Sequence, residues 1–418
     1  MEQIVMLTLG LAVTLGTAPA FGPSDVAPDQ SDNKEAPTWA SAVEPKPLSD
    51  NVKEGLAWLI KTQLPSGGWG QGEESSNMGG GQANFKDIAN VADTCMATLA
   101  LIRAGSTPST GPHAVSIGKG VDFICGQIEE SDPSSLWVTP LRGTRLQMKL
   151  GTYIDTFLAA MLLSEVKDGM PDAPGNARVA SALNKVIEKM EKNQSHDGSW
   201  DNQGWAPALA QSMASKAINR AAQAGARVDE AVCERAESYA RDKFDDKSGR
   251  VADDGSAGVE LYAYAATLGS MQDADNTNAV KEGEIKERIA GAVTQQERDE
   301  AERDMRRFAE TKAALSNAKK MVIKKLDNPQ FIAGFGSNGG EEFLSYMNIG
   351  ESLVVDGGAE WEKWDKSITK NLNRIQNGDG SWTGHHCITG RSFCTSTALL
   401  VLTVDRAPVP LAAKIRRR

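Results

Sequence analysis

The stretch LNRIQNGDGSW, residues 372–382, decides the fold. It reads as the end of a helix, a Gln, a tight Gly-containing turn and a Trp. The Asp-Gly step breaks the helix and supplies a turn with positive φ, and the Trp offers a large apolar surface to a neighbouring hairpin. The Gln is suited to hydrogen-bond carbonyls that a helix end leaves unpaired. The same core recurs as MEKNQSHDGSW at 190–200 and as WLIKTQLPSGGW at 58–69.

A second kind of helix is expected between and after these cores, rich in small and apolar residues. Such stretches are apolar nearly all round, which predicts burial on more than one face. The preceding helices, such as the one expected at 179–193, have one polar side. Buried inner helices that alternate with amphipathic outer ones predict a two-layer helical ring, and an open solenoid is the alternative. The expected inner helices are 93–101, 155–163, 212–222, 260–266, 342–353 and 394–402.

The Gln-x-x-Asp-Gly-Ser-Trp core with a following Thr-Ala-Leu-rich helix resembles the prenyltransferase and squalene-oxidase repeat, over residues 48–405. The resemblance implies an all-α fold, an α/α toroid of repeated helical hairpins in two concentric layers around a central cavity. The Asp-x-Asp-Asp acid motif of squalene-type cyclases is absent, because Asp253-Asp254 lacks the other members. Cyclisation by that route is therefore not expected.

The chain divides into five parts by composition. Residues 1–20 contain an apolar run and a small-residue site, which predicts a signal peptide and export to the periplasm, cell envelope or medium; the run is too short to span a bilayer. The n-region carries Glu2 and no Lys or Arg, so a weakly structured N-terminus is the alternative. Residues 21–47 are expected to form a disordered linker, 48–410 the toroid and 411–418 a basic tail.

Residues 280–327 interrupt the repeat with a dense mixture of Glu, Lys, Arg and Gln. Apolar positions at helical spacing predict one long helix or a helical hairpin. It is expected to be a solvated spacer, a docking arm for a protein partner or a lid over the cavity. The net charge of −10 argues against nucleic acid as a partner and leaves contact with a membrane surface open.

Acidic residues stand near the start of several expected inner helices and are the first candidates for catalysis. An acidic residue at a helix start also caps unpaired N–H groups and complements the helix dipole, so capping is the alternative for each of them. In a ring these positions would face one mouth of the cavity. The candidates are Asp93, Asp155, Glu260 and Glu342.

The stretch GHHCITGRSFC, residues 384–394, adds His385 and Arg391 as catalytic candidates. His, Cys and Asp are ligand types of a catalytic zinc site. The resemblance to protein prenyltransferases implies an Asp-x-Cys at an inner helix start and a His one repeat away. A disulfide between two of these cysteines is the alternative in an exported protein. The candidate zinc ligands are Asp93, Cys95, His385, His386, Cys387 and Cys394.

Three functions remain open at this point. The first is a cell-envelope binding or scaffold protein that holds an apolar or isoprenoid small molecule in its central cavity. The second is a zinc-dependent enzyme that acts on such a ligand. The third is a carbohydrate-active toroid, which needs two carboxylates about 5–9 Å apart.

Overall fold

The computed structural model describes residues 38–75, 85–201, 203–252, 254–407 and 413–416. The predicted signal peptide and residues 21–37 of the predicted linker lie outside this range. The described chain is predominantly helical, as predicted. Its helices are α1 (Asp50–Thr62), α2 (Val91–Arg103), α3 (Ala114–Glu130), α4 (Arg145–Lys149), α5 (Ile154–Val166), α6 (Ala173–Lys192), α7 (Pro207–Gln223), α8 (Glu230–Asp242), α9 (Glu260–Gly291), α10 (Gln295–Lys325), α11 (Pro329–Ile332), α12 (Gly340–Val354), α13 (Gly358–Arg374) and α14 (Arg391–Leu402).

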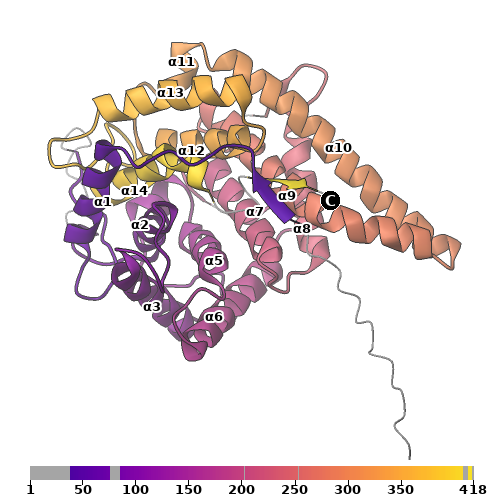
Figure 1. The fold of residues 1–418 in the computed structure, drawn as a ribbon, viewed down its shortest axis with the longest axis horizontal. Helices are drawn as coiled ribbons and strands as arrows, with labels where there is room; N and C mark the ends of the chain where they lie inside the picture. The colour runs from indigo at the N-terminus through magenta and orange to yellow at the C-terminus, as the bar shows by residue number, and fades with distance from the viewer. Residues whose placement is uncertain (1–37, 76–84, 202, 253, 408–412, 417–418) are drawn as a thin grey trace, which may run out of the picture. The chain divides into compact units, whose positions relative to one another are not determined.

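Six helices contact one another in a closed series. Helix α2 packs on α5, α5 on α7, α7 on α9, α9 on α12, α12 on α14, and α14 returns to α2. The part of each helix that lies in this series is buried nearly all round, which matches its apolar sequence. Helices α1, α3, α6, α8 and α13 bury one face each against the series and expose the other (Figure 1).

The repeated Gln and Trp make the same hydrogen bonds at each of their three positions. The Trp382 indole Nε1 donates to the carbonyl of Leu372 at the end of α13 (2.8 Å). Gln376 Nε2 donates to the turn carbonyl of Gly380 (2.8 Å) and to the carbonyl of Asn51 in α1 (2.9 Å). Gln63 and Gln194 likewise reach from their own turns to α3 and α8. The signature therefore ties α1 to α3, α6 to α8 and α13 to α1.

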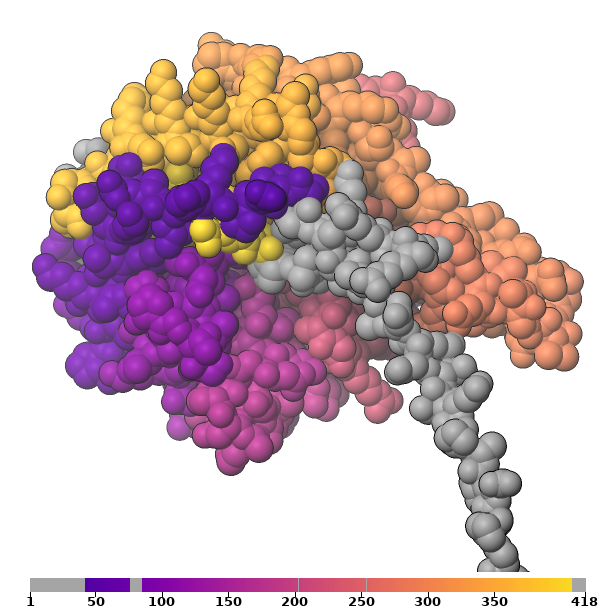
Figure 2. All heavy atoms as spheres, in the orientation of Figure 1, coloured from indigo at the N-terminus to yellow at the C-terminus, as the bar shows by residue number. Residues whose placement is uncertain are grey.

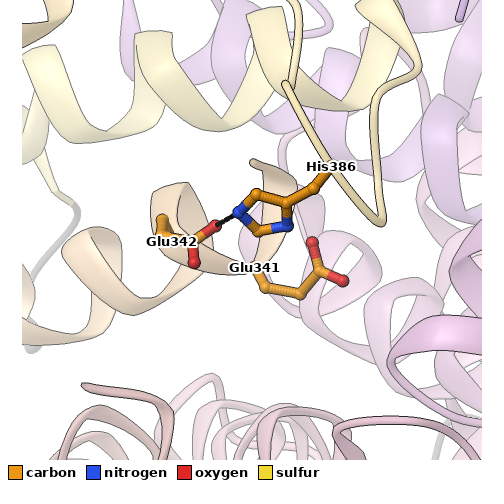
Figure 3. Close-up of side chains that lie close together, drawn as sticks. All are labelled: Glu341, Glu342 and His386. Atoms are coloured by element: carbon orange, nitrogen blue, oxygen red, sulfur yellow. Dashed lines mark ion pairs between the residues drawn. The ribbon is translucent and has the colours of Figure 1, made fainter. Parts of the chain in front are cut away.

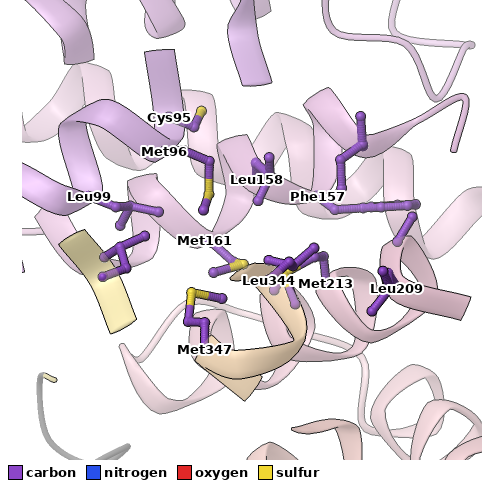
Figure 4. Packing of buried hydrophobic residues seen from close by; sticks show 14 of the residues in the cluster. Cys95, Met96, Leu99, Phe157, Leu158, Met161, Leu209, Met213, Leu344 and Met347 are labelled. Atoms are coloured by element: carbon purple, nitrogen blue, oxygen red, sulfur yellow. The ribbon is translucent and has the colours of Figure 1, made fainter. Parts of the chain in front are cut away.

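Methionine, leucine and phenylalanine side chains fill the space between the six helices at mid-height. They come from α2, α5, α7 and α12 and point toward one another (Figure 4). Their exposed fractions are 0–2%, so the interior is close-packed at this level. The residues labelled in the view are Cys95, Met96, Leu99, Phe157, Leu158, Met161, Leu209, Met213, Leu344 and Met347.

A network of six charged side chains lies among the same helices, nearer their C-terminal ends. Glu351 of α12 is its centre, since it accepts from Lys216 (2.7 Å), Arg220 (3.1 Å) and Arg103 (3.3 Å). Asp273 pairs with Lys216, and Glu165 pairs with both arginines. The six side chains expose only 0–5% of their surface and come from α2, α5, α7, α9 and α12. The network, which the sequence analysis did not predict, connects five of the six inner helices by ion pairs.

The charged insertion is a helical hairpin formed by the second half of α9 with α10. It carries a small apolar cluster of its own, formed by Ile285, Ala301 and Phe308. The hairpin extends away from the other helices (Figures 1 and 2). The inner helix and the first arm of the insertion are one continuous helix, which the change in composition near residue 280 did not indicate.

Two short antiparallel sheets accompany the helices. Strand β1 (Thr38–Ser41) pairs with β4 (Ala413–Arg416), so part of the predicted linker pairs with part of the predicted basic tail. Strands β2 (Phe244–Asp245) and β3 (Arg250–Val251) form a hairpin before α9. Within the described residues, no helix is both long and apolar enough to cross a bilayer.

Candidate metal centre

The first turn of α12 carries two adjacent carboxylates, Glu341 and Glu342, both with an exposed fraction of 0%. The loop of residues 384–390 packs directly on this turn, and glycines make the approach possible. A Cβ on Gly340 would lie 2.6 Å from the side chain of Ile388, and one on Gly339 would lie 2.9 Å from the carbonyl oxygen of His386. The Gly-Gly step before the two glutamates thus allows the loop to deliver a histidine to them.

Glu341, Glu342 and His386 form a group whose potential ligand atoms all lie within 4.8 Å of one another. The imidazole lies between the two carboxylates (Figure 3). His386 Nε2 is 3.4 Å from Glu342 Oε2. Ligands of a tetrahedral zinc ion lie about 2.0–2.2 Å from it, so the three side chains are near enough to one another to share one ion after rearrangement.

Hydrogen bonds leave one free atom on each of these three side chains. His386 Nε2 lies 2.7 Å from the carbonyl oxygen of Ser337, and because that oxygen only accepts, Nε2 carries the proton. The lone pair of the neutral ring is then on Nδ1. Among the described residues, His386 Nδ1, Glu341 Oε1 and Glu342 Oε2 are buried without a hydrogen-bond partner. In a metal-bound histidine, one ring nitrogen usually binds the metal and the other donates its N–H to a backbone carbonyl or a carboxylate.

The remaining carboxylate oxygens are held in place by neighbours. Glu342 Oε1 accepts from the Tyr262 hydroxyl of α9 and from the backbone N–H of Phe335 (3.0 Å). Glu341 Oε2 accepts from the backbone N–H of Ile388 (3.2 Å). Each glutamate thus has one oxygen oriented by the protein and one oxygen free. Such support fixes the direction of a metal ligand.

Burial and mutual repulsion govern the charge of the pair. Burial, with the charge of Glu342 added, raises the pKa of Glu341 to about 8. Burial also raises the pKa of Glu342, which the charge of His386 and the Tyr262 hydroxyl oppose. Two carboxylates in this position do not both ionise readily, whereas a divalent cation between them would stabilise both charges.

Asp93 and Asp155 lie at the starts of α2 and α5, and their contacts are those of helix-end residues. Asp155 Oδ1 accepts from the backbone N–H of Ala92 (3.0 Å), and its Oδ2 accepts from Gln147 (2.8 Å). Asp93 accepts from the side chain of Asn90 (2.7 Å). Asp155, in the first turn of α5, therefore caps a backbone N–H at the start of the neighbouring helix α2. This is the capping alternative, with the capped N–H in another helix.

Asp93 makes the stability of the fold depend on pH. Burial raises its pKa to about 8, although the Asn90 amide opposes the shift. In the unfolded chain the carboxyl has a pKa of about 3.9, so the folded state holds its proton more tightly. The stabilisation of the folded state by protonated Asp93 is therefore complete below about pH 4 and is lost as the pH rises to 8. We expect Asp93→Asn to raise the free energy of unfolding at pH 8 by about 1–3 kcal/mol and to change it little at pH 4.5.

Urea unfolding of both proteins at the two pH values measures this difference, with Glu260→Gln as the exposed control. If the free energy of unfolding decreases by the same amount between pH 4.5 and 8 in wild type and in Asp93→Asn, Asp93 is ionised in the folded protein. That result would contradict the prediction.

The other predicted site residues lie apart from the three-residue group. Glu260 is exposed and pairs with Lys325 (3.0 Å). His385 is exposed beside His386, and Arg391 pairs with Asp379 (2.6 Å) at a pocket of about 680 Å³ between α1 and the start of α14. Among the described residues, no three-ligand group joins Asp93 or Cys95 to these histidines.

All five cysteines are free and buried. Cys394 donates to the carbonyl of Ile388 (3.4 Å), whereas Cys95 is fully buried in the apolar interior. Cys387 adopts a positive φ of 52° and lies near Glu341. Burial and the charge of Glu341 raise its pKa to about 12, so Cys387 is a neutral thiol at pH 7.

Sequence analysis found Glu342 and His386 but not their partner Glu341. The pair of adjacent glutamates directly after Gly-Gly was the available signal, since a helix start needs only one acidic residue for its dipole. Comparison of the chain with protein-family models and with curated protein sequences gives no match.

Proposed function

We propose that this chain is an α/α toroid whose functional group is a divalent metal ion bound by Glu341, Glu342 and His386. The single observation that carries the proposal is that three buried side chains, whose potential ligand atoms lie within 4.8 Å of one another, each retain a buried polar atom without a hydrogen-bond partner. The closed series of inner helices and the Gln–Trp ties support the toroid. Three protein ligands leave at least one position for water or a substrate, as in catalytic rather than structural zinc sites.

This ligand set favours a metal-dependent enzyme over the scaffold and carbohydrate alternatives. The carboxylates and the imidazole suit Zn²⁺ and Mn²⁺, and the usual order of affinities places Zn²⁺ first. Bound there, the ion would supply Lewis-acid activation of a water or a carbonyl group. Phe335 lies beside His386, and Trp205 lies beside Phe335, an apolar surrounding that suits an apolar substrate. Glu341 and Glu342 are adjacent and both buried, so they do not flank a sugar in the manner of glycosidase carboxylates.

Export, a cell-envelope location, an isoprenoid-like ligand and a protein partner at the 280–327 hairpin stay proposals that accompany this one. The secretory composition of residues 1–20 supports export. The hairpin extends from the ring and so offers surface for a partner.

Titration of chelator-treated protein with Zn²⁺ tests the proposed function. We expect one ion per chain by calorimetry, with weaker binding of Mn²⁺. At a free Zn²⁺ concentration of 100 times the Kd, the folded protein gains about 2.7 kcal/mol, which appears as a rise in Tm. The absence of both binding heat and any change in Tm at millimolar Zn²⁺ would contradict the proposal.

A further inference from the structure

A short flap, Gly334-Phe335-Gly336, lies between α11 and α12 and contacts two of the three ligands, Glu342 and His386. Phe335 is 54% exposed, which is unusual for a large aromatic side chain that also contacts a buried site. Gly334 has a φ of +59° and Gly336 a φ of +135°, backbone conformations that favour glycine. The flap therefore places one bulky residue between two glycines whose backbone conformations other residues rarely adopt.

The flap touches the ligands through both its backbone and its ring. The Phe335 N–H donates to Glu342 Oε1 (3.0 Å). The Phe335 ring lies edge-on to the His386 ring at 5.2 Å and to the Trp205 ring at 5.1 Å, measured between centroids. A Cβ on Gly334 would lie only 2.4 Å from Glu342 Oε1, so the backbone itself rests on this carboxylate.

The ligands are closed to solvent while the flap is in this position. Glu341 and Glu342 are fully buried, and His386 is 8% exposed. The ligands also contact Tyr262 of α9, Ser337 and Ile388, and Cys387 lies near Glu341. An ion therefore reaches the site only if some covering segment moves. Displacement of the flap breaks the hydrogen bond from Phe335 to Glu342 and two edge contacts, and it affects the backbone hydrogen bonds of Gly334 to Phe331 and of Gly336 to Ala333. Displacement of a helix disrupts the core as well.

We propose that the Gly334-Phe335-Gly336 flap gates the exchange of the metal ion, with the Phe335 ring as the group that closes the site. The inference rests on the proposed metal site and concerns its regulation. In the open position the backbone turns at the two glycines, and the ring leaves His386 for solvent. The flap then sets how fast an ion enters and leaves, because both directions use the same opening. It has little effect on the affinity, since Phe335 contributes no ligand atom.

Stopped-flow measurement of the Zn²⁺-loaded protein against excess chelator, and of the metal-free protein against Zn²⁺, tests the gate. For Phe335→Ala we expect both the release rate and the entry rate to rise at least about tenfold, while the Kd changes less than about threefold. Phe335→Leu should keep slow exchange because leucine still covers the ring of His386. Val293→Ala, at an exposed apolar residue of the hairpin tip, is the matched control and should leave both rates unchanged.

Two results would overturn the gate. Unchanged rates in Phe335→Ala would show that ions enter elsewhere, and a faster release with unchanged entry would show that Phe335 stabilises the bound ion instead. Both results leave the metal site itself intact. A wild-type protein that takes up no Zn²⁺ removes the site and the gate together, so the two failures are distinguishable.

Discussion

Replacement of His386 by alanine is expected to weaken Zn²⁺ binding at least about 100-fold. The substitution removes one of three protein ligands. Loss of a residue that only hydrogen-bonds to a ligand already lowers metal affinity about 10–100-fold, so loss of a ligand itself should cost at least as much. Without the imidazole, Glu341 and Glu342 remain as a buried pair that shares protons and holds an ion poorly. Competition with a chromophoric chelator gives the affinities of the wild-type and variant proteins on one scale.

His385→Ala is the control that the chain itself provides. His385 is the adjacent residue, is exposed, and donates its backbone N–H to the carbonyl of Asn338 (2.8 Å), a hydrogen bond that alanine retains. Its affinity for Zn²⁺ should match that of wild type. Glu342→Gln should behave like His386→Ala, since it keeps the shape but removes the charge. Equal affinities for wild type and His386→Ala, with both proteins folded in thermal unfolding, would place the ion elsewhere.

Glu351→Ala is expected to lower the free energy of unfolding by about 3–5 kcal/mol. Glu351 accepts hydrogen bonds from Arg103, Lys216 and Arg220, and these three cations hold its pKa well below its usual range although burial opposes them. Its removal leaves three buried cations with only Glu165 and Asp273. A buried charge that loses its partner is among the most destabilising local changes in a protein.

Urea unfolding measures this loss against Glu260→Ala, which breaks the exposed pair with Lys325 and should cost no more than about 1 kcal/mol. Similar unfolding midpoints for the two variants would show that the network carries no more stability than a surface ion pair. The expected difference follows from burial, because both glutamates pair with lysine at hydrogen-bond distance.

The helical architecture could be predicted because its determinants are local. Gln376, Gly380 and Trp382 act within one turn of chain, and each does what its side chain suggests: the glycine has a φ of +89°, and the indole caps its helix. Five of the six apolar inner helices are found close to their predicted ranges for the same reason, whereas the one expected at 260–266 is the first part of the longer α9. The second hydrogen bond of Gln376, to Asn51, joins residues 325 positions apart, and only the folded chain shows it.

The candidate site was predictable only in part because tertiary packing builds it. The sequence indicated His386 and Glu342 by type, but their meeting depends on how the loop of residues 384–390 packs on Gly339 and Gly340. The resemblance to protein prenyltransferases favoured Asp93 as a partner, whereas the structure uses Asp93 at the start of α2. The buried ion network had no sequence signal at all, since Lys216 and Glu351 read as ordinary charges on helices.

Anomalous diffraction from crystals of the Co²⁺-loaded protein tests the central claim most directly. The account predicts one strong peak per chain, about 2.0–2.2 Å from His386 Nδ1 and from one oxygen each of Glu341 and Glu342. A peak near Asp93, Cys95 or His385 instead, or no peak between the two glutamates in crystals that contain Co²⁺, would contradict it.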